Sequence, residues 1–326
     1  MMERMSKPVL FVSFRPLDRA ENLRSIYEYY SGPKVHMLTS DPHYKEEVLS
    51  GKYDVMVTDE FPDITPGKCI MIWHGIQGGK TIGLDQPGHP YYNPEWANCM
   101  THIISASHDM VPVWSRCTGV PEERVLPLGM PRTDECFGKH KGDGHTQLEF
   151  YRSYLYVPTF RDRNEPSLPD IDWRFIDEYL LDDELLAIKI HPWYTTNGSC
   201  SFDISGCHHI TMIPPGIPSA PYLYDADVVI TDYSSIMFDA YLLNKPVVLF
   251  EKNPGYTTTR GMYLDYPSQY SSRYATDEHR LLVLLRTAEV LIDTERECRR
   301  IVADMCDGNS RYRLTKLINS LNGGDS

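Results

Sequence analysis

Short apolar runs alternate with amphipathic stretches through the first half of the chain. Runs of four or five aliphatic and β-branched residues predict buried strands, and the longer amphipathic stretches predict helices. The predicted strands are Val9–Ser13, Val35–Thr39, Val55–Thr58, Cys69–Trp73, His102–Ala106 and Arg124–Leu128, with a predicted helix at Glu21–Tyr30. Strands that alternate with helices indicate a parallel sheet built from βα units.

A polar, glycine-rich stretch, Gly138–His145, interrupts this pattern and is predicted to be a linker. The pattern then restarts, with predicted strands at Leu155–Val157, Leu186–Ile190, Val228–Thr231 and Pro246–Phe250 and predicted helices at Asp277–Ile292, Glu295–Met305 and Ser310–Leu321. We therefore predict two Rossmann-like α/β domains, residues 1–145 and 146–309, facing a central cleft. Residues 310–326 are predicted as a helix that packs back on the first domain. Ligands of such sheets bind at the carboxyl ends of the strands.

Composition narrows the class of protein. The chain has 326 residues, enough for two domains, and its net charge of −13 argues against a nucleic-acid partner. Its eight cysteines include no C-x-x-C pair, and no apolar run is long enough to span a bilayer. The first eight residues are followed by no long apolar run either, which argues against a secretory signal. These features predict a cytoplasmic protein with reduced thiols.

The first chemical motif follows a predicted strand of the second domain. The strand ends at Thr231 and continues as Asp232-Tyr-Ser-Ser-Ile-Met-Phe-Asp239, which predicts a helix with Ser234 or Ser235 near its N-cap. Free N–H groups and the helix dipole favour an anion at such a position. An ordinary serine cap is the alternative, and the position at a strand's carboxyl end favours phosphate binding.

The second motif follows a predicted strand of the first domain. His74 comes directly after the apolar run, and Gly75, Gly78, Gly79 and Lys80 follow it. Histidine has a reference pKa near neutrality, which suits a general base. The spacing before Lys80 is not that of a nucleotide P-loop. Taken by itself, a histidine such as His74 is more often structural, and the position at a strand end favours a base only together with the other motifs.

Two further residues follow strands of the second domain. His191 stands before Pro192 at the end of one strand, and an imidazole there could donate to a phosphate oxygen. Arg161, in Pro158–Asp162, could contact a phosphate or pair with Asp162. No D-x-D pair stands out as a metal site, so no protein-bound metal is expected.

Taken together and in this order, the motifs resemble the CDP-glycerol glycerophosphotransferase family, the teichoic-acid primase and polymerase enzymes. The matching pieces are Trp73–Gly75 with Lys80 and Gly83, Gly129–Asp134, Pro158–Asp162, His191–Pro192, Thr231–Ser235 with Phe238–Asp239, and Arg260–Tyr263 with Asp265–Tyr266. The resemblance implies a glycosyltransferase-B fold. It also implies a CDP-activated polyol donor, CDP-glycerol or CDP-ribitol, bound mainly by the second domain. We expect no required cofactor.

The resemblance implies roles for single residues as well. His74 matches the family's proposed base, and His191 matches its second essential histidine. The residues expected to bind the donor or its phosphates are Lys80, Arg161, Thr231, Asp232, Ser234, Ser235 and Asp239. An acceptor hydroxyl would attack the β-phosphorus of the donor and expel CMP.

The acceptor implied by the resemblance is a hydroxyl of a glycan or a lipid-linked glycan, in teichoic-acid-like or capsule assembly. A lipid-linked acceptor implies a peripheral position at the inner face of the cell membrane. Two alternatives stay open at this point: a nucleotide-sugar glycosyltransferase of the same fold, and a non-catalytic nucleotide-binding relative. Single transfer and polymerisation are likewise both open.

Overall fold

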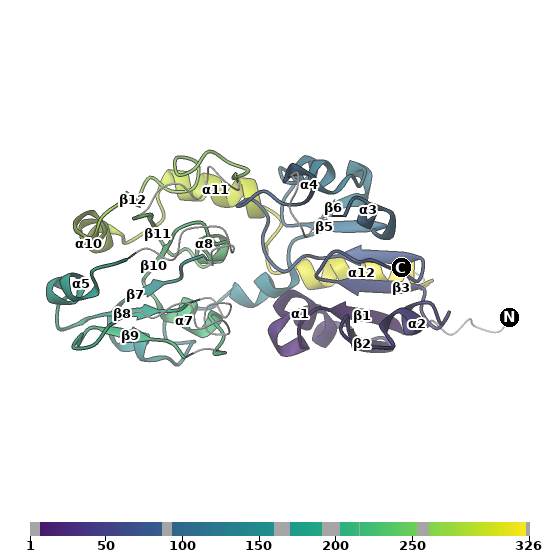
Figure 1. Cartoon of the computed structure of the whole chain (residues 1–326), viewed down its shortest axis with the longest axis horizontal. Coiled ribbons are helices and arrows are strands. Elements are labelled where there is room, and N and C mark those ends of the chain that lie inside the picture. Colours follow the sequence, from purple (N-terminus) through teal and green to yellow (C-terminus); the bar gives the residue numbers. More distant parts are fainter. Residues whose placement is uncertain are drawn as a thin grey trace. The chain divides into compact units, whose positions relative to one another are not determined.

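The computed structural model describes residues 7–86, 93–159, 170–190, 203–214, 216–252 and 261–323. The chain divides into two compact units. The first contains residues 1–77, 81–137 and 300–326, and the second contains residues 78–80 and 138–299. Each unit carries one sheet with its own helices (Figure 1).

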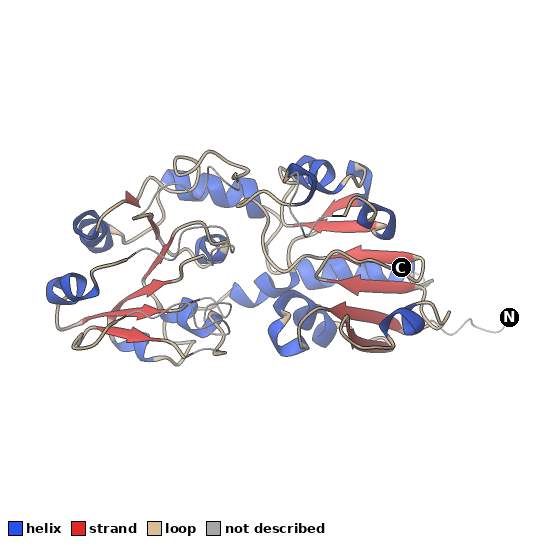
Figure 2. Cartoon of the chain, viewed as in Figure 1, coloured by secondary structure: helices blue, strands red, loops and turns tan. Residues whose placement is uncertain are grey.

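In the described part of the first unit, six strands form a parallel sheet in the order β2-β1-β3-β4-β5-β6 (Figure 2). The strands are β1 Val9–Ser13, β2 Lys34–Leu38, β3 Val55–Thr58, β4 Lys68–Met71, β5 His102–Ser105 and β6 Val125–Pro127. The helices are α1 Glu21–Tyr29, α2 Tyr44–Val48, α3 Trp96–Cys99, α4 Val111–Thr118 and α12 Ser310–Leu321, with 3-10 turns η1 Leu17–Arg19, η2 Gly83–Asp85, η3 Glu122–Arg124 and η4 Pro131–Cys136.

Helix α12, from the end of the chain, completes the core of the first unit. Its Leu314 and Ile318 are buried in one cluster with Val9 and Phe11 of β1. The yellow helix lies along this sheet in Figure 1. Asp134 accepts hydrogen bonds from the first two N–H groups of α12, at 3.0 and 2.8 Å, and so satisfies donors that a helix start leaves without partners.

In the described part of the second unit, six strands form another parallel sheet, in the order β12-β11-β10-β7-β8-β9. The strands are β7 Arg152–Tyr156, β8 Glu184–Ile188, β9 Ile210–Met212, β10 Val228–Thr231, β11 Val247–Phe250 and β12 Tyr274–Ala275. The helices are α5 Trp173–Tyr179, α7 Ala220–Asp225, α8 Ile236–Leu242, α10 Glu278–Thr287 and α11 Asp293–Ala303, with the 3-10 turn η5 Gln147–Phe150. Helix α11 crosses the division, since residues 300–303 belong to the first unit.

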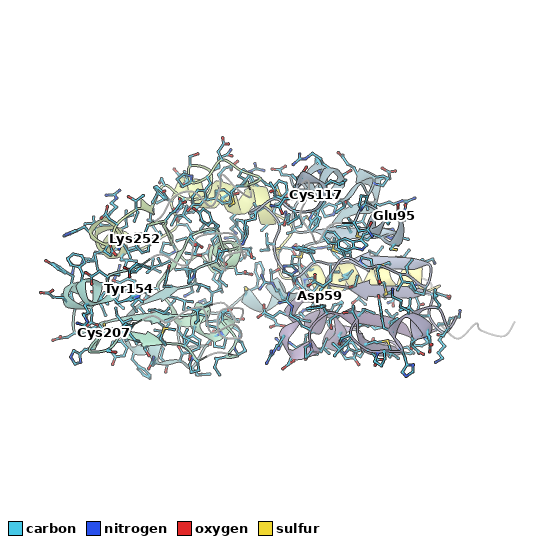
Figure 3. The ribbon with its side chains drawn as sticks, in the orientation of Figure 1. Asp59, Glu95, Cys117, Tyr154, Cys207 and Lys252 are labelled. Carbon is cyan, nitrogen blue, oxygen red and sulfur yellow. The ribbon has the colours of Figure 1, made fainter. Side chains whose placement is uncertain are left out.

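The core of the second unit forms where two helices cover its sheet. Ile176 of α5 and Leu281 and Leu285 of α10 are buried in one cluster with Tyr154 and Tyr156 of β7. Tyr154 is labelled in Figure 3, on the strand at the middle of this sheet. Because both sheets are parallel, the carboxyl ends of all strands in a sheet lie along one edge, which is where ligands of such sheets bind.

The division between the units differs from the predicted one. The boundary expected after residue 145 lies after residue 137, and the boundary expected after 309 lies after 299. The stretch predicted as a linker belongs to the second unit because the Asp225 carboxylate accepts N–H groups from Gly142 and Gly144, both at 2.9 Å. Residues after 299 join the first unit through contacts such as Met305 N–H to Ala106 O, 3.1 Å.

Several predicted elements were too long, among them one strand and one helix. Strand β4 ends at Met71, and Trp73, which was predicted in the strand, adopts a left-handed backbone with φ 52°. The helix predicted to reach Ile292 ends at Thr287, and α11 begins at Asp293. The short strands β9 and β12, at the two edges of the second sheet, were not predicted.

Candidate active site

The segment predicted to hold the donor's pyrophosphate joins β10 to α8. Thr231 donates its hydroxyl to Val157 O at 2.6 Å, and the Asp232 carboxylate accepts N–H groups from Thr159 at 2.8 Å and Tyr233 at 2.6 Å. Both side chains are buried. These hydrogen bonds therefore fix the segment after β10 to the segment after the neighbouring strand β7.

The two serines lie at the start of α8, half-buried. Ser235 occupies the N-cap position, but its hydroxyl makes no capping hydrogen bond, and the Ser234 hydroxyl reaches the Ile236 N–H only at 3.5 Å. The predicted serine cap is therefore weak. Both hydroxyls lie at the carboxyl edge of the sheet and contribute little to holding the start of the helix. Asp239 is buried in the first turns of the helix, where a carboxylate is favoured by the dipole.

His74 lies at the carboxyl edge of the first sheet, three residues after β4 ends. Its side chain is 43% exposed, and its Nδ1 lies 3.6 Å from Oε1 of Glu60. The imidazole packs against the Trp73 ring, with centroids 4.2 Å apart. Asn22, which is fully buried, donates to Trp73 O at 3.0 Å and so supports the left-handed backbone just before His74.

Acidic residues after β3 set the electrostatics around His74. Arg15 pairs with Glu60 at 3.3 Å. Burial raises the pKa of Glu60, and the charge of Arg15 opposes this. Burial and then the negative charge of Glu60 raise the pKa of Asp59 to about 7, again opposed by Arg15. Asp59 is labelled in Figure 3. Neither carboxylate was predicted as part of the site, although the position of both directly after a buried strand was the available signal.

The glycine-rich segment after His74 passes into the second unit. Gly78 O accepts the Tyr270 hydroxyl at 2.7 Å, and Gly79 O accepts the Tyr263 N–H at 2.9 Å. Lys80 forms an isolated antiparallel bridge with Met262. A Cβ on Gly79 would meet the Phe238 ring of α8 at 3.8 Å, so this segment lies beside the start of the predicted donor helix.

The motif around Gly129 has a structural role. Gly129 adopts φ +80°, and a Cβ there would lie 2.3 Å from Met305 O and from Ser310 Oγ. The motif's Asp134 binds the start of α12, as described above.

Arg161 and His191 lie outside the described residues, so their predicted roles stay predictions.

The residues that the structure describes lack two features: a cluster of metal-binding side chains and a membrane-spanning helix. No group of three or more histidine, cysteine, aspartate or glutamate side chains there could hold a metal ion. No helix within the same ranges has the length and apolar character needed to cross a membrane.

Two parallel α/β sheets with polar side chains at their carboxyl edges define the glycosyltransferase-B class of fold. The structure superposes on the wall teichoic acid polymerase TagF with a TM-score of 0.73 at 18% identity, covering 97% of this chain and 89% of that one. It also matches an S. aureus MnaA–UDP co-structure with a TM-score of 0.61 at 13% identity, covering 96% of each chain. The predicted fold class is confirmed.

A family model described as CDP-Glycerol:Poly(glycerophosphate) glycerophosphotransferase matches residues 53–320. The match covers most of the chain, which therefore belongs to this family of transferases. The resemblance found in the sequence motifs is confirmed. Glu60, His74 and the Asp232–Asp239 segment all fall within the matched residues.

Curated relatives agree with the family. The teichoic acid glycerol-phosphate primase of Bacillus subtilis (strain 168) is 26% identical over 270 residues, covering 78% of this chain and 68% of that protein. The teichoic acid poly(ribitol-phosphate) polymerase of Bacillus spizizenii is 27% identical over 305 residues, covering 80% of this chain and 48% of that protein. The chain thus spans about two thirds of one relative and about half of the other.

Proposed function

We propose that this chain transfers a phosphopolyol group from a CDP-activated donor to a hydroxyl of a glycan acceptor and releases CMP. The observation that carries the proposal is the family match over residues 53–320, which includes both His74 and the segment between β10 and α8. Glycerol phosphate is the proposed group, because the family is described by it and a structurally similar TagF variant was soaked with CDPG.

The proposed reaction is a direct displacement at phosphorus. His74 takes the proton of the acceptor hydroxyl, whose oxygen forms a bond to the β-phosphorus of the donor. The bond between that phosphorus and the bridging oxygen breaks, and the electron pair leaves with CMP. Ser234 and Ser235 donate their hydroxyls to the pyrophosphate, because neither hydroxyl forms a strong cap of α8. Arg161 and His191 donate to the pyrophosphate as well.

A donor panel tests the reaction class. The protein is incubated with CDP-glycerol, CDP-ribitol and a set of nucleotide sugars, each with a glycan acceptor, and nucleotide release is measured. The proposal predicts CMP from a CDP-polyol. Release from a nucleotide sugar alone would make the protein a glycosyltransferase of the same fold. Donor binding without release from any donor would make it a non-catalytic relative.

A variant of the proposed base tests the mechanism. His74→Ala should lower kcat by about two to four powers of ten, as removal of a general base does, with donor binding retained. The matched control is His43→Ala, because His43 is also exposed in the first unit and also pairs with a glutamate. His43→Ala should leave kcat within about twofold. An unchanged rate in His74→Ala would remove His74 from the mechanism.

The finer features of the reaction are proposals as well. The acceptor is a lipid-linked glycan of teichoic-acid or capsule assembly, which places the protein at the cytoplasmic face of the membrane. Co-sedimentation with vesicles should then require the lipid-linked acceptor. Transfer needs no resident cofactor, so dialysis against EDTA should leave the rate unchanged. A loss of rate that Mg²⁺ restores would contradict this.

A further inference from the structure

Neighbouring strands bring a histidine and a glutamate together at the edge of the first sheet. Strands β3 and β4 pair in parallel, with Thr58 opposite Met71 at their carboxyl ends. Glu60 lies two residues beyond Thr58, and His74 lies three residues beyond Met71. Their side chains meet with Nδ1 and Oε1 3.6 Å apart. The pair is therefore a product of the sheet register.

Arginine supports the glutamate from a third strand. Strand β1 pairs with β3 on its other side, and Arg15 lies two residues beyond its end. The Arg15 Nη2 atom lies 3.3 Å from the same Oε1 of Glu60 that faces His74. The Glu60 side chain is 28% exposed: burial raises its pKa, and the Arg15 cation opposes this and favours the ionised form. The other acid at this edge is Asp59, which is buried and has one carboxylate oxygen without a hydrogen-bond partner.

The imidazole is also limited in how it can turn. The Trp73 ring packs against it, with centroids 4.2 Å apart, and Phe61 packs against Trp73 with centroids 5.0 Å apart. The residue before His74 has a left-handed backbone that Asn22 holds through its carbonyl. These contacts hold the ring with Nδ1 toward Glu60, so Nε2 is on the opposite side of the ring from Glu60.

We propose that Glu60 is a positioning residue for His74: it accepts the Nδ1 proton and so keeps the Nε2 lone pair available to the acceptor hydroxyl. The inference rests on the proposed function, in which His74 is the base. When Nε2 takes the acceptor's proton, the imidazolium forms beside the Glu60 carboxylate, which stabilises it. The separation of 3.6 Å is longer than a hydrogen bond, so the proposal requires the two side chains to approach each other when substrate binds.

Replacing the carboxylate by an amide of the same shape tests this role. Glu60→Gln should lower kcat by about 10- to 100-fold, the range seen when the carboxylate partner of a metal-bound histidine is removed, with the KM for donor within about twofold. The matched control is Glu46→Gln, because Glu46 pairs with His43 Nδ1 at 3.3 Å in the same unit and is exposed. Glu46→Gln should leave both constants within about twofold.

The pH profile separates positioning from a general effect on folding. An anion beside an imidazolium stabilises it, so its loss should move the acidic limb of the kcat profile to lower pH. Even at the dielectric constant of water, the attraction between two unit charges 3.6 Å apart corresponds to a shift of roughly one pH unit, which is the smallest movement of the limb that we expect. A fall in kcat with an unmoved acidic limb would assign Glu60 a purely structural role. Equal losses in Glu60→Gln and Glu46→Gln would also overturn the proposal.

A readout without turnover separates this inference from the proposed function. The imidazole of His74 is titrated by NMR in the wild-type protein and in Glu60→Gln, with its signal assigned by comparison with His74→Ala. The pairing predicts a lower titration midpoint in Glu60→Gln, and identical midpoints would overturn it. Absence of CMP release from any CDP-polyol would refute the proposed function while leaving this titration result intact.

Discussion

Asn22 connects the strained backbone at Trp73 to the placement of the proposed base. A left-handed backbone costs a residue other than glycine about 1–2 kcal/mol. The buried Asn22 amide donates to Trp73 O at 3.0 Å, and its oxygen accepts the Arg132 N–H at 3.1 Å. Each bond contributes about 1 kcal/mol net, and a buried group left without its partner costs about 1–3 kcal/mol. The free energy that the hydrogen bonds of Asn22 contribute is thus comparable to the cost of the left-handed backbone at Trp73.

Asn22→Ala should therefore lower the free energy of unfolding by about 2–4 kcal/mol and let the backbone at Trp73 relax. If this relaxation makes the correct placement of His74 less favourable by about 1.4 kcal/mol, kcat should fall by about tenfold. The matched control is Ser25→Ala, three residues on in the same helix. Ser25 donates to Pro131 O at 3.0 Å, is buried, and makes no contact with Trp73 among its described hydrogen bonds.

Denaturant unfolding and steady-state CMP release measure the two effects separately. Both variants should unfold at lower denaturant concentration, and Asn22→Ala alone should lose activity, with the donor's KM nearly unchanged. If Asn22→Ala keeps the kcat of Ser25→Ala, the left-handed backbone at Trp73 does not control the position of His74, and the reasoning is refuted.

Two further predictions concern the stability of the second unit. Asp225→Asn should cost about 2–3 kcal/mol, because Asp225 accepts N–H and O–H from Thr146 at 2.8 and 2.7 Å as well as two glycine N–H groups. Burial acts to raise the pKa of Asp225, and these hydrogen bonds outweigh it and lower the pKa, so the stabilisation is present above about pH 4 and is lost as pH falls further. A difference in unfolding free energy that persists undiminished at pH 3 would contradict this. Glu295→Gln should cost about 3–5 kcal/mol, because it removes the charge that pairs with the buried Arg273 at 2.8 Å, and adding Arg273→Met should cost less than the sum of the two single changes. Additive costs in a double-mutant cycle would refute coupling between them.

The central strands were predictable because they are buried on both faces. All five residues of β1 and all four of β10 are buried, so each strand reads as a continuous apolar run. The edge strands β9 and β12 have three and two residues, too few to leave a pattern. Local runs therefore identified the middle of each sheet and missed the edges of the second.

The positions of the site residues were predictable only in part. His74 and Ser234 were found because each follows an apolar run directly. Glu60 was missed, since its link to His74 depends on which strands pair and in what register. The role of Asp225 was likewise hidden, because its partners lie about 80 residues earlier in the chain. Contacts between distant segments leave no local pattern in one sequence.

The central claim is that a phosphopolyol moves intact from the donor to the acceptor. The most direct measurement uses CDP-glycerol labelled in its glycerol and follows the label and CMP together, in the presence of a glycan acceptor. The account predicts that label enters the acceptor with one CMP released for each label transferred, and that His74→Ala abolishes both. Release of CMP while the label stays in a small molecule, or transfer of label at an undiminished rate by His74→Ala, would contradict it.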